Sequence, residues 1–108
     1  MVRKQGDSDL ESRHAVYLVK MGDGPAALKA MEAVAGRPNL TAQVLFRATV
    51  VFELAGARER ALDSLRRALA AGYAVADVAS EPELTTLRAD TRYHRLLDSA
   101  ATLSPPAK

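Results

Sequence analysis

The sequence predicts an all-α fold built from antiparallel helix hairpins in one domain. Its 108 residues, 48% hydrophobic and 26% charged, fit a single globular domain. The chain is rich in Ala and Leu and contains no Ile, so helix-favouring residues outnumber β-branched ones. Between its glycines, apolar residues recur at three- and four-residue spacings, which is the pattern of short amphipathic helices.

The first predicted helix begins at Ser8, which forms a capping box with Glu11. One face of this helix carries five residues at helical spacing: Leu10, His14, Tyr17, Leu18 and Met21. Gly22 ends the helix, and Asp23 or Gly24 caps a second one, whose first turn suits Pro25. The apolar stripe of the second helix is Ala27, Leu28, Met31 and Val34, and Gly36-Arg37-Pro38 ends it.

Asn39 or Thr41 caps a third helix, which Gly56 ends in a tight turn. The main stripe of the third helix is Leu40, Val44, Leu45, Ala48, Val51, Phe52 and Ala55. A fourth helix ends at Gly72 and carries Ala61, Leu62, Leu65, Ala68 and Leu69 on one face. Its charged residues fall mostly outside that face: Arg58, Arg60, Asp63, Arg66 and Arg67.

The pattern changes after Gly72. Pro82 opens a short helix that carries Leu84 and Leu87. Asp90 caps a last helix, with one face formed by Tyr93, Leu96 and Leu97. We expect both ends of the chain to fray.

A constant shift of 34 residues along the chain places the first pair of predicted helices on the second without a gap. We call it the repeat shift; it pairs Gly22 with Gly56, Ala27 with Ala61, Leu28 with Leu62, Met31 with Leu65, Val34 with Ala68 and Leu18 with Phe52. A repeat of this length, about 34 residues, is typical of helix hairpins that stack into a short α-solenoid.

This helix–turn–helix unit resembles the tetratricopeptide repeat. The second unit reads Leu45-x-x-Ala48-Thr49-x-x-Phe52, then Gly56, then Ala61-x-x-x-Leu65-x-x-Ala68. The first unit reads Glu11-x-x-His14-Ala15-x-x-Leu18, then Gly22, then Ala27-x-x-x-Met31. Thr49 replaces the usual Gly, Glu11 replaces a large apolar residue, and Gly72-Tyr73 stands where Pro closes the repeat.

The chain after the second unit resembles the segment that closes tetratricopeptide arrays in bacterial multidomain regulators. Its matching residues are Ala70-Ala71-Gly72-Tyr73 and Glu81-Pro82-Glu83-Leu84-x-x-Leu87-Arg88-x-Asp90-x-Arg92-Tyr93-x-x-Leu96-Leu97. The resemblance implies a helical cap on the last repeat. The expected organisation is a flexible N-terminus at 1–7, a repeat domain at 8–102 and a flexible tail at 103–108. Within the domain, the repeats cover about 8–36 and 39–72, and the cap covers about 74–99.

No residue cluster in the sequence supports catalysis. The chain has no Cys, which excludes disulfides, thiolate metal sites and a cysteine nucleophile. We expect His14 to be packed in the apolar face of the first helix and His94 to be exposed beside Arg92 and Arg95. Neither histidine belongs to a metal-ligand motif. The sequence therefore predicts a protein that is not an enzyme and that holds no metal or cofactor.

The third helix is apolar nearly all round, because Phe46, Val50 and Leu54 add a second stripe. The resemblance implies that the first helix of each unit lines a concave surface, where a partner helix or extended peptide binds. The first unit contributes Ser12, Val16, Val19 and Lys20; the second contributes Phe46, Arg47, Val50 and Leu54, with Glu53 at the rim. In the alternative, the segment 82–97 folds onto this stripe and fills it.

These features favour a protein-interaction module, either an adaptor or a segment of a larger regulator. The alternative is a homodimerisation domain that pairs through residues 10–21, because two repeats are fewer than an independent stack usually needs. Nucleic-acid binding through the arginines of the fourth helix is less favoured, since the net charge is only +2. With no apolar run of bilayer length and no signal at the start, we expect a cytoplasmic protein without membrane contact.

Overall fold

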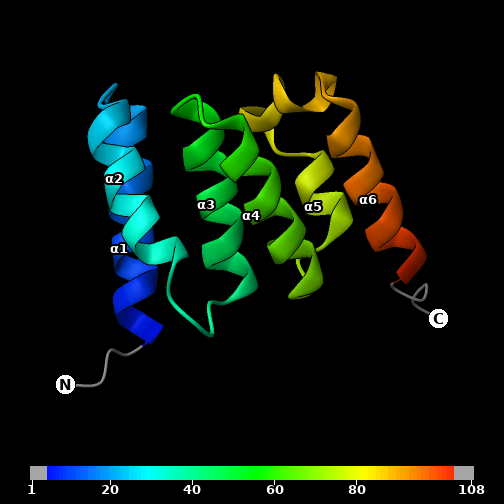
Figure 1. Cartoon of the computed structure of the whole chain (residues 1–108), viewed down its shortest axis with the longest axis horizontal. Coiled ribbons are helices and arrows are strands. Elements are labelled where there is room, and N and C mark those ends of the chain that lie inside the picture. The colour runs from blue at the N-terminus through cyan, green and yellow to red at the C-terminus, as the bar shows by residue number, and fades with distance from the viewer. Residues whose placement is uncertain (1–4, 104–108) are drawn as a thin grey trace.

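The computed structural model describes residues 5–103, and their regular elements are all helical (Figure 1). The elements are α1 (Gln5–Lys20), α2 (Gly24–Ala35), α3 (Ala42–Leu54), α4 (Arg58–Ala70), α5 (Val75–Ala79), the 3₁₀ turns η1 (Pro82–Leu84) and η2 (Leu87–Ala89), and α6 (Thr91–Leu103). The prediction of an all-α fold is confirmed for this part of the chain. Flexible ends are predicted at 1–7 and 103–108; of these, 1–4 and 104–108 lie outside the described residues, whereas 5–7 belong to α1 and 103 belongs to α6.

The helices follow one another along the molecule, which measures 40 × 32 × 19 Å (Figure 1). α1 packs against α2, and α3 packs against α4, so each short turn joins two antiparallel helices. The first hairpin meets the second because both α1 and α2 contact α3. At the other end, α6 packs against α4, and η1 contacts α3.

The turns inside the two hairpins make the same backbone hydrogen bonds at positions related by the repeat shift. N–H groups donate from Gly22 to Val19 and from Asp23 to Leu18 in the first turn, and from Gly56 to Glu53 and from Ala57 to Phe52 in the second. Gly22 and Gly56 have φ angles of +91° and +85°. A side chain at these left-handed positions costs about 1–2 kcal/mol, which explains why glycine occupies both.

Side-chain caps start the second and third helices where the sequence predicts them. Asp23 accepts a hydrogen bond from the Ala26 N–H at 3.2 Å, and Thr41 accepts one from the Val44 N–H at 3.2 Å. Each cap satisfies a backbone donor that has no partner inside the helix, an effect worth about 1 kcal/mol.

A first core cluster lies between the two hairpins. Its buried members are Ala15, Val19, Ala27, Met31, Val34, Val44, Ala48, Val51, Phe52 and Ala61. Met31 and Phe52 are its largest side chains, and each has almost no exposed surface. Burial of a side chain of this size contributes about 1.5–3 kcal/mol, and the alanines let the helices approach closely around it.

A second core cluster joins the α3–α4 hairpin to the C-terminal segment. It contains Leu45, Phe46, Val50, Leu62, Leu65, Ala68, Val78, Leu84, Leu87 and Tyr93. α3 therefore contributes buried residues to both clusters, as expected of a helix that is apolar nearly all round.

The start of α1 differs from the prediction. The helix begins at Gln5, so Ser8 lies inside it and does not act as its cap. Instead, Arg37 donates to the Ser8 hydroxyl at 3.1 Å and to the Glu11 carboxylate at 2.6 Å. The two residues of the predicted capping box thus tie α1 to the loop that follows α2.

The buried face of α1 is also not the predicted one. Its buried side chains are Ser8, Ser12, Ala15 and Val19. Leu10, Tyr17 and Met21 are 64%, 59% and 65% exposed. The prediction that His14 is packed is wrong, because it is exposed with them. The small residues permit close contact with α2 and α3, and this outweighs the hydrophobicity of the larger residues on the opposite face.

The C-terminal segment is more broken than the sequence predicts. α5 was not expected, and Pro82 opens a single 3₁₀ turn instead of a helix. Leu84 and Leu87 nevertheless point into the second cluster and are fully buried. Asp90 accepts a hydrogen bond from the Arg92 N–H at 2.9 Å at the start of α6.

Candidate partner-binding groove

A cavity of about 280 Å³ opens between α1, α3 and the segment 73–83. We call it the groove; its lining is Arg13, Val16, Lys20, Gln43, Phe46, Arg47, Val50, Tyr73, Glu81 and Glu83. α1 and α3, the first helices of the two hairpins, together supply one wall, and the segment 73–83 supplies the other. The groove therefore exists only because the C-terminal segment folds back toward α3.

The floor of the groove is apolar and well packed. The rings of Phe46 and Tyr73 stack with centroids 4.2 Å apart and planes 10° from parallel. Phe46 and Val50 are nearly buried, whereas Val16 and Tyr73 stay partly exposed. Burial raises the pKa of the Tyr73 hydroxyl above its usual range, with a smaller contribution from the Asp77 carboxylate.

Charged side chains form the rim. Lys20 of α1 and Glu83 of η1 make an ion pair of 2.7 Å, which links the two walls. The hydrogen bond from Lys20 to Glu83 raises the pKa of the lysine. Arg47 bonds to the Asp9 carboxylate and to the Ser12 hydroxyl, so it holds α1 against α3. Its partner Asp9 has a lowered pKa, mainly because of this hydrogen bond.

The structure brings five of the nine predicted partner-binding residues together at the groove: Val16, Lys20, Phe46, Arg47 and Val50. The other four lie elsewhere. Ser12 and Val19 are buried, so neither is open to a partner. Glu53 is paired with Arg58 at 2.7 Å, and its side chain is 6% exposed. Leu54 is 41% exposed but does not line the groove.

Two alternatives are predicted for the second stripe of α3: a surface open to a partner, or a surface covered by the segment 82–97. The structure shows part of each. Leu84 and Leu87 of the closing segment share a core cluster with Phe46 and Val50, so the segment does pack on the stripe. The packing is incomplete, because Phe46 and Val50 also line the groove. The segment thus builds a wall beside the stripe instead of filling the whole surface.

Sequence reasoning missed half of the lining. Arg13 and Gln43 lie on helices that it did consider, while Tyr73, Glu81 and Glu83 come from the segment after α4. In the sequence, these three residues are part of the resemblance to the segment that closes tetratricopeptide arrays, but none of them was predicted to belong to the binding surface. An aromatic residue directly after the turn at Gly72 was a usable signal, because large aromatics outside a repeat need a surface to pack on.

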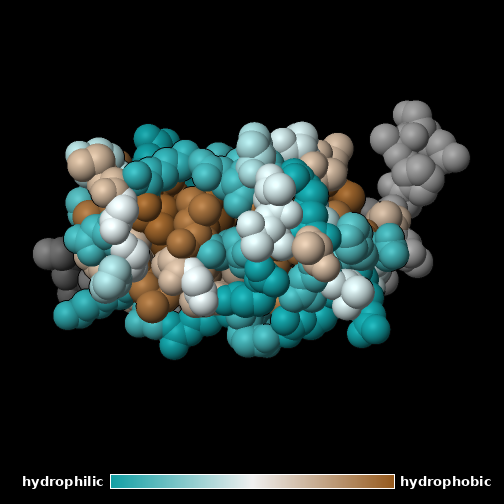
Figure 2. Space-filling view, turned by 90° about the horizontal axis from the view of Figure 1, so that it is seen from above, coloured by the Kyte–Doolittle hydropathy of each residue, from teal (hydrophilic) through white to brown (hydrophobic). Residues whose placement is uncertain are grey.

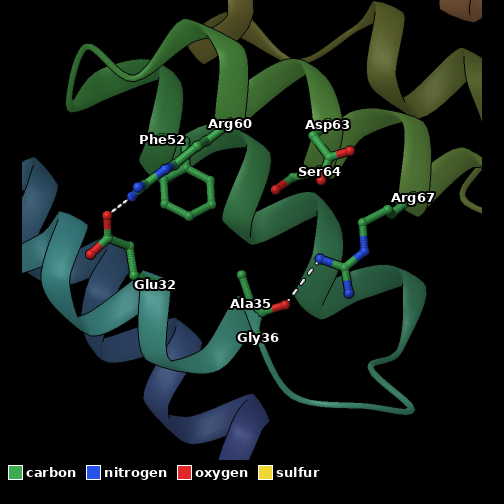
Figure 3. A pocket seen from close by; sticks show the side chains of 8 residues that line it. All are labelled: Glu32, Ala35, Gly36, Phe52, Arg60, Asp63, Ser64 and Arg67. Carbon is green, nitrogen blue, oxygen red and sulfur yellow. Dashed lines mark hydrogen bonds and ion pairs between the residues drawn. The ribbon is translucent and has the colours of Figure 1, made fainter.

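A second cavity of about 310 Å³ lies on the α2–α4 side of the molecule (Figure 3). Its two arginines already have partners within the protein. Arg60 of α4 makes an ion pair with Glu32 of α2, and Arg67 donates to the Ala35 carbonyl at 3.0 Å. These contacts tie the two hairpins together and occupy the charges that an anionic ligand would need.

The remaining arginines of α4 are engaged in the same way. Arg58 bonds to Glu53 and lies 3.3 Å from Asp90, and Arg66 pairs with Asp63 at 2.7 Å. The bonds to Glu53, followed by those to Asp90, raise the pKa of Arg58. Arg58, Arg60 and Arg66 are thus compensated by carboxylates, and Arg67, bonded to a carbonyl, keeps its charge, so this face offers a phosphate backbone little free positive charge.

Within residues 5–103, no three or more His, Cys, Asp or Glu side chains gather closely enough to hold a metal ion. None of the described helices has the length and hydropathy needed to cross a bilayer.

Comparison of the chain with protein-family models, with curated proteins and with solved structures found no match.

Proposed function

We propose that this protein is an interaction module whose groove binds an apolar side chain of a partner peptide or helix. The observation that supports the proposal most directly is the groove itself. It combines a packed aromatic floor, formed by Phe46 and Tyr73, with charged groups on both walls. Apolar concavities with a few polar groups at the edge are the usual form of a peptide-binding surface.

We further propose that the two hairpins are tetratricopeptide-like repeats of a short α-solenoid and that residues 74–99 cap them. The matching hydrogen bonds of the two turns, which the repeat shift relates, support this. So does the complete burial of Ala27 and Ala61, which occupy the same position in the two units. In such a stack the first helices of the units share one face, and α1 and α3 both line the groove.

The charged side chains at the rim indicate which charges a partner peptide carries. Lys20, Arg13 and Arg47 face the groove from the helix walls, and Glu81 and Glu83 face it from the other wall. A peptide with an apolar residue flanked by an acidic group on one side and a basic group on the other matches this distribution. Lys20 and Glu83 form an ion pair with each other in the unbound protein. A charged partner therefore breaks this ion pair and forms new ion pairs with Lys20 and Glu83.

The proposal is tested with a phage-displayed library of random peptides, selected on the immobilised wild-type chain. Selected peptides are synthesised and titrated by fluorescence anisotropy. We expect an apolar anchor in their sequences and a loss of at least about tenfold in affinity for Val16→Glu, which puts a charge on the partly exposed floor.

A matched pair of variants separates the groove from general charge effects. Lys20→Glu changes a lysine at the rim, and Lys29→Glu makes the same change on the exposed surface of α2. We expect the first to weaken binding and the second to leave it unchanged. Selection of no peptide, or of peptides that bind Val16→Glu as well as wild type, would reject the groove as the binding site.

A further inference from the structure

The outward face of α1 carries an exposed apolar stripe, formed by Leu10, His14, Tyr17 and Met21. Leu10, Tyr17 and Met21 are each more than half exposed. The rings of His14 and Tyr17 are stacked with centroids 6.5 Å apart. Spacings of four, three and four residues keep these side chains in one row along the helix. A separate view, from the end of the molecule where the turns within the two hairpins lie, shows apolar residues gathered over the first hairpin and α3, with polar residues around them (Figure 2).

The second hairpin shows what covers this face when a neighbour is present. The repeat shift places the stripe on Val44, Ala48, Val51 and Ala55 of α3. The first three are almost completely buried, in a cluster with Ala27, Met31 and Val34 of α2. In α3, this face therefore packs against an apolar helix of the preceding hairpin. α1 presents the same face with no helix against it among the described residues.

We propose that a second copy of this chain covers the stripe, with the two α1 helices antiparallel about a two-fold axis. The spacing of the stripe reads the same in both directions, and its centre lies between positions 15 and 16. In the dimer, Leu10 meets Met21 of the partner subunit, and His14 meets Tyr17 of the partner subunit. The stripe is thus complementary to itself, which is the condition for an isologous interface.

Three charged residues beside the stripe, Arg13, Lys20 and Glu11, are already paired within the chain. Arg13 forms an ion pair with Asp9 at 3.2 Å, and Lys20 forms one with Glu83. Glu11 on the other flank is bonded to Arg37. When the same flanks of two copies meet, Arg13, Lys20 and Glu11 each bring their own counter-ion. The interface then depends on apolar contact and should persist in high salt.

None of the four stripe residues lines the groove, and of the groove residues on α1 only Arg13 and Lys20 flank the stripe, so the dimer leaves the floor at Val16 uncovered. The inference does not depend on peptide binding. If the proposed function also holds, the dimer presents two grooves, and a partner with two linked motifs gains affinity from both.

The test is sedimentation equilibrium of the full chain over a concentration series in low and high salt. For a contact of one short helix per subunit we expect a dissociation constant in the micromolar range, on the order of 1–100 µM. Tyr17→Glu should leave a monomer, and at concentrations well below the dissociation constant it should melt like wild type, because Tyr17 is mostly exposed. Leu54→Glu, an equal change at an exposed apolar residue outside the stripe, should leave the dimer intact.

The absence of cysteine allows the orientation to be tested by cross-linking. A mixture of His14→Cys and Tyr17→Cys chains should form a disulfide between unlike copies faster than either variant forms one alone. Faster cross-linking within each single variant would reject the antiparallel arrangement. A chain that stays monomeric up to about 1 mM, or a Tyr17→Glu variant that still dimerises, would reject the interface.

Discussion

α1 and α3 begin their hairpins in the same way but are buried to very different extents. Eight of the thirteen residues of α3 are buried, on both sides of the helix. In α1, the buried side chains among those described are Ser8, Ser12, Ala15 and Val19. α3 has the first hairpin on one side and the C-terminal segment on the other, while the main packing partners of α1 are α2 and α3. Positions that the repeat shift pairs thus differ in burial, because burial depends on the elements packed against each helix.

We expect the largest loss in the free energy of unfolding for a substitution on the side of α3 that faces the C-terminal segment. Phe46→Ala should lower the free energy of unfolding by about 3–5 kcal/mol, because the ring is nearly buried and stacks on Tyr73. Urea unfolding followed by circular dichroism measures this change. The α1 counterpart under the repeat shift is Ser12, and Ser12→Ala should cost much less, about 1 kcal/mol for its hydrogen bond with Arg47.

A smaller loss of stability tests whether the two hairpins are equivalent. Ala27 and Ala61 are both fully buried and are related by the repeat shift. Ala27→Leu and Ala61→Leu should each destabilise the fold by about 1–3 kcal/mol, because added methylene groups overfill a close helix contact. Equal urea midpoints for Ala61→Leu and wild type would show that the helices do not meet closely there. A large effect at Ala61 alone would break the equivalence.

The smallest effect we expect is on the acid sensitivity of unfolding, through Asp90 at the start of α6. Hydrogen bonds from the Arg92 side chain and backbone, followed by one from Arg58, hold the pKa of the Asp90 carboxyl well below its usual range. Such a group stabilises the fold above its unfolded-state pKa of about 4, and this contribution is lost as the pH falls through the folded-state value. Asp90→Asn should therefore unfold with a weaker dependence on pH below about 4.

That prediction is checked by thermal melting of wild type and Asp90→Asn at a series of acidic pH values. Asp63→Asn serves as the control, since Asp63 pairs with Arg66 on an exposed face. Curves for Asp90→Asn that parallel those of wild type at every pH would contradict the assignment of acid sensitivity to this carboxylate.

Sequence reasoning succeeded where local chemistry determines the structure. The glycine turns, the caps Asp23 and Thr41, and the stripes of α2 and α4 each depend on neighbouring residues in the chain. It failed on the buried face of α1, because periodicity selects the largest apolar residues, whereas close packing selected Ser12 and Ala15.

Half of the residues that line the groove could be predicted from the sequence, because they lie on helices whose spacing is local. Val16, Lys20, Phe46, Arg47 and Val50 follow from helix spacing in the two units. The opposite wall depends on how the segment 73–83 folds back, and that path is determined by burial of Val78 and Leu84 against α3 and α4. Long-range contacts of this kind leave no periodic pattern in the segment itself.

The central claim is that α1 and α3 are equivalent helices, one uncovered and one enclosed. Tyr17 and Val51 occupy the same position in the two units, and the measurement is the free energy of unfolding of Tyr17→Ala and Val51→Ala in dilute solution. We expect a loss of about 2 kcal/mol for Val51→Ala, which is fully buried, and a change within about 0.5 kcal/mol for Tyr17→Ala. Losses of similar size for the two variants would contradict the account.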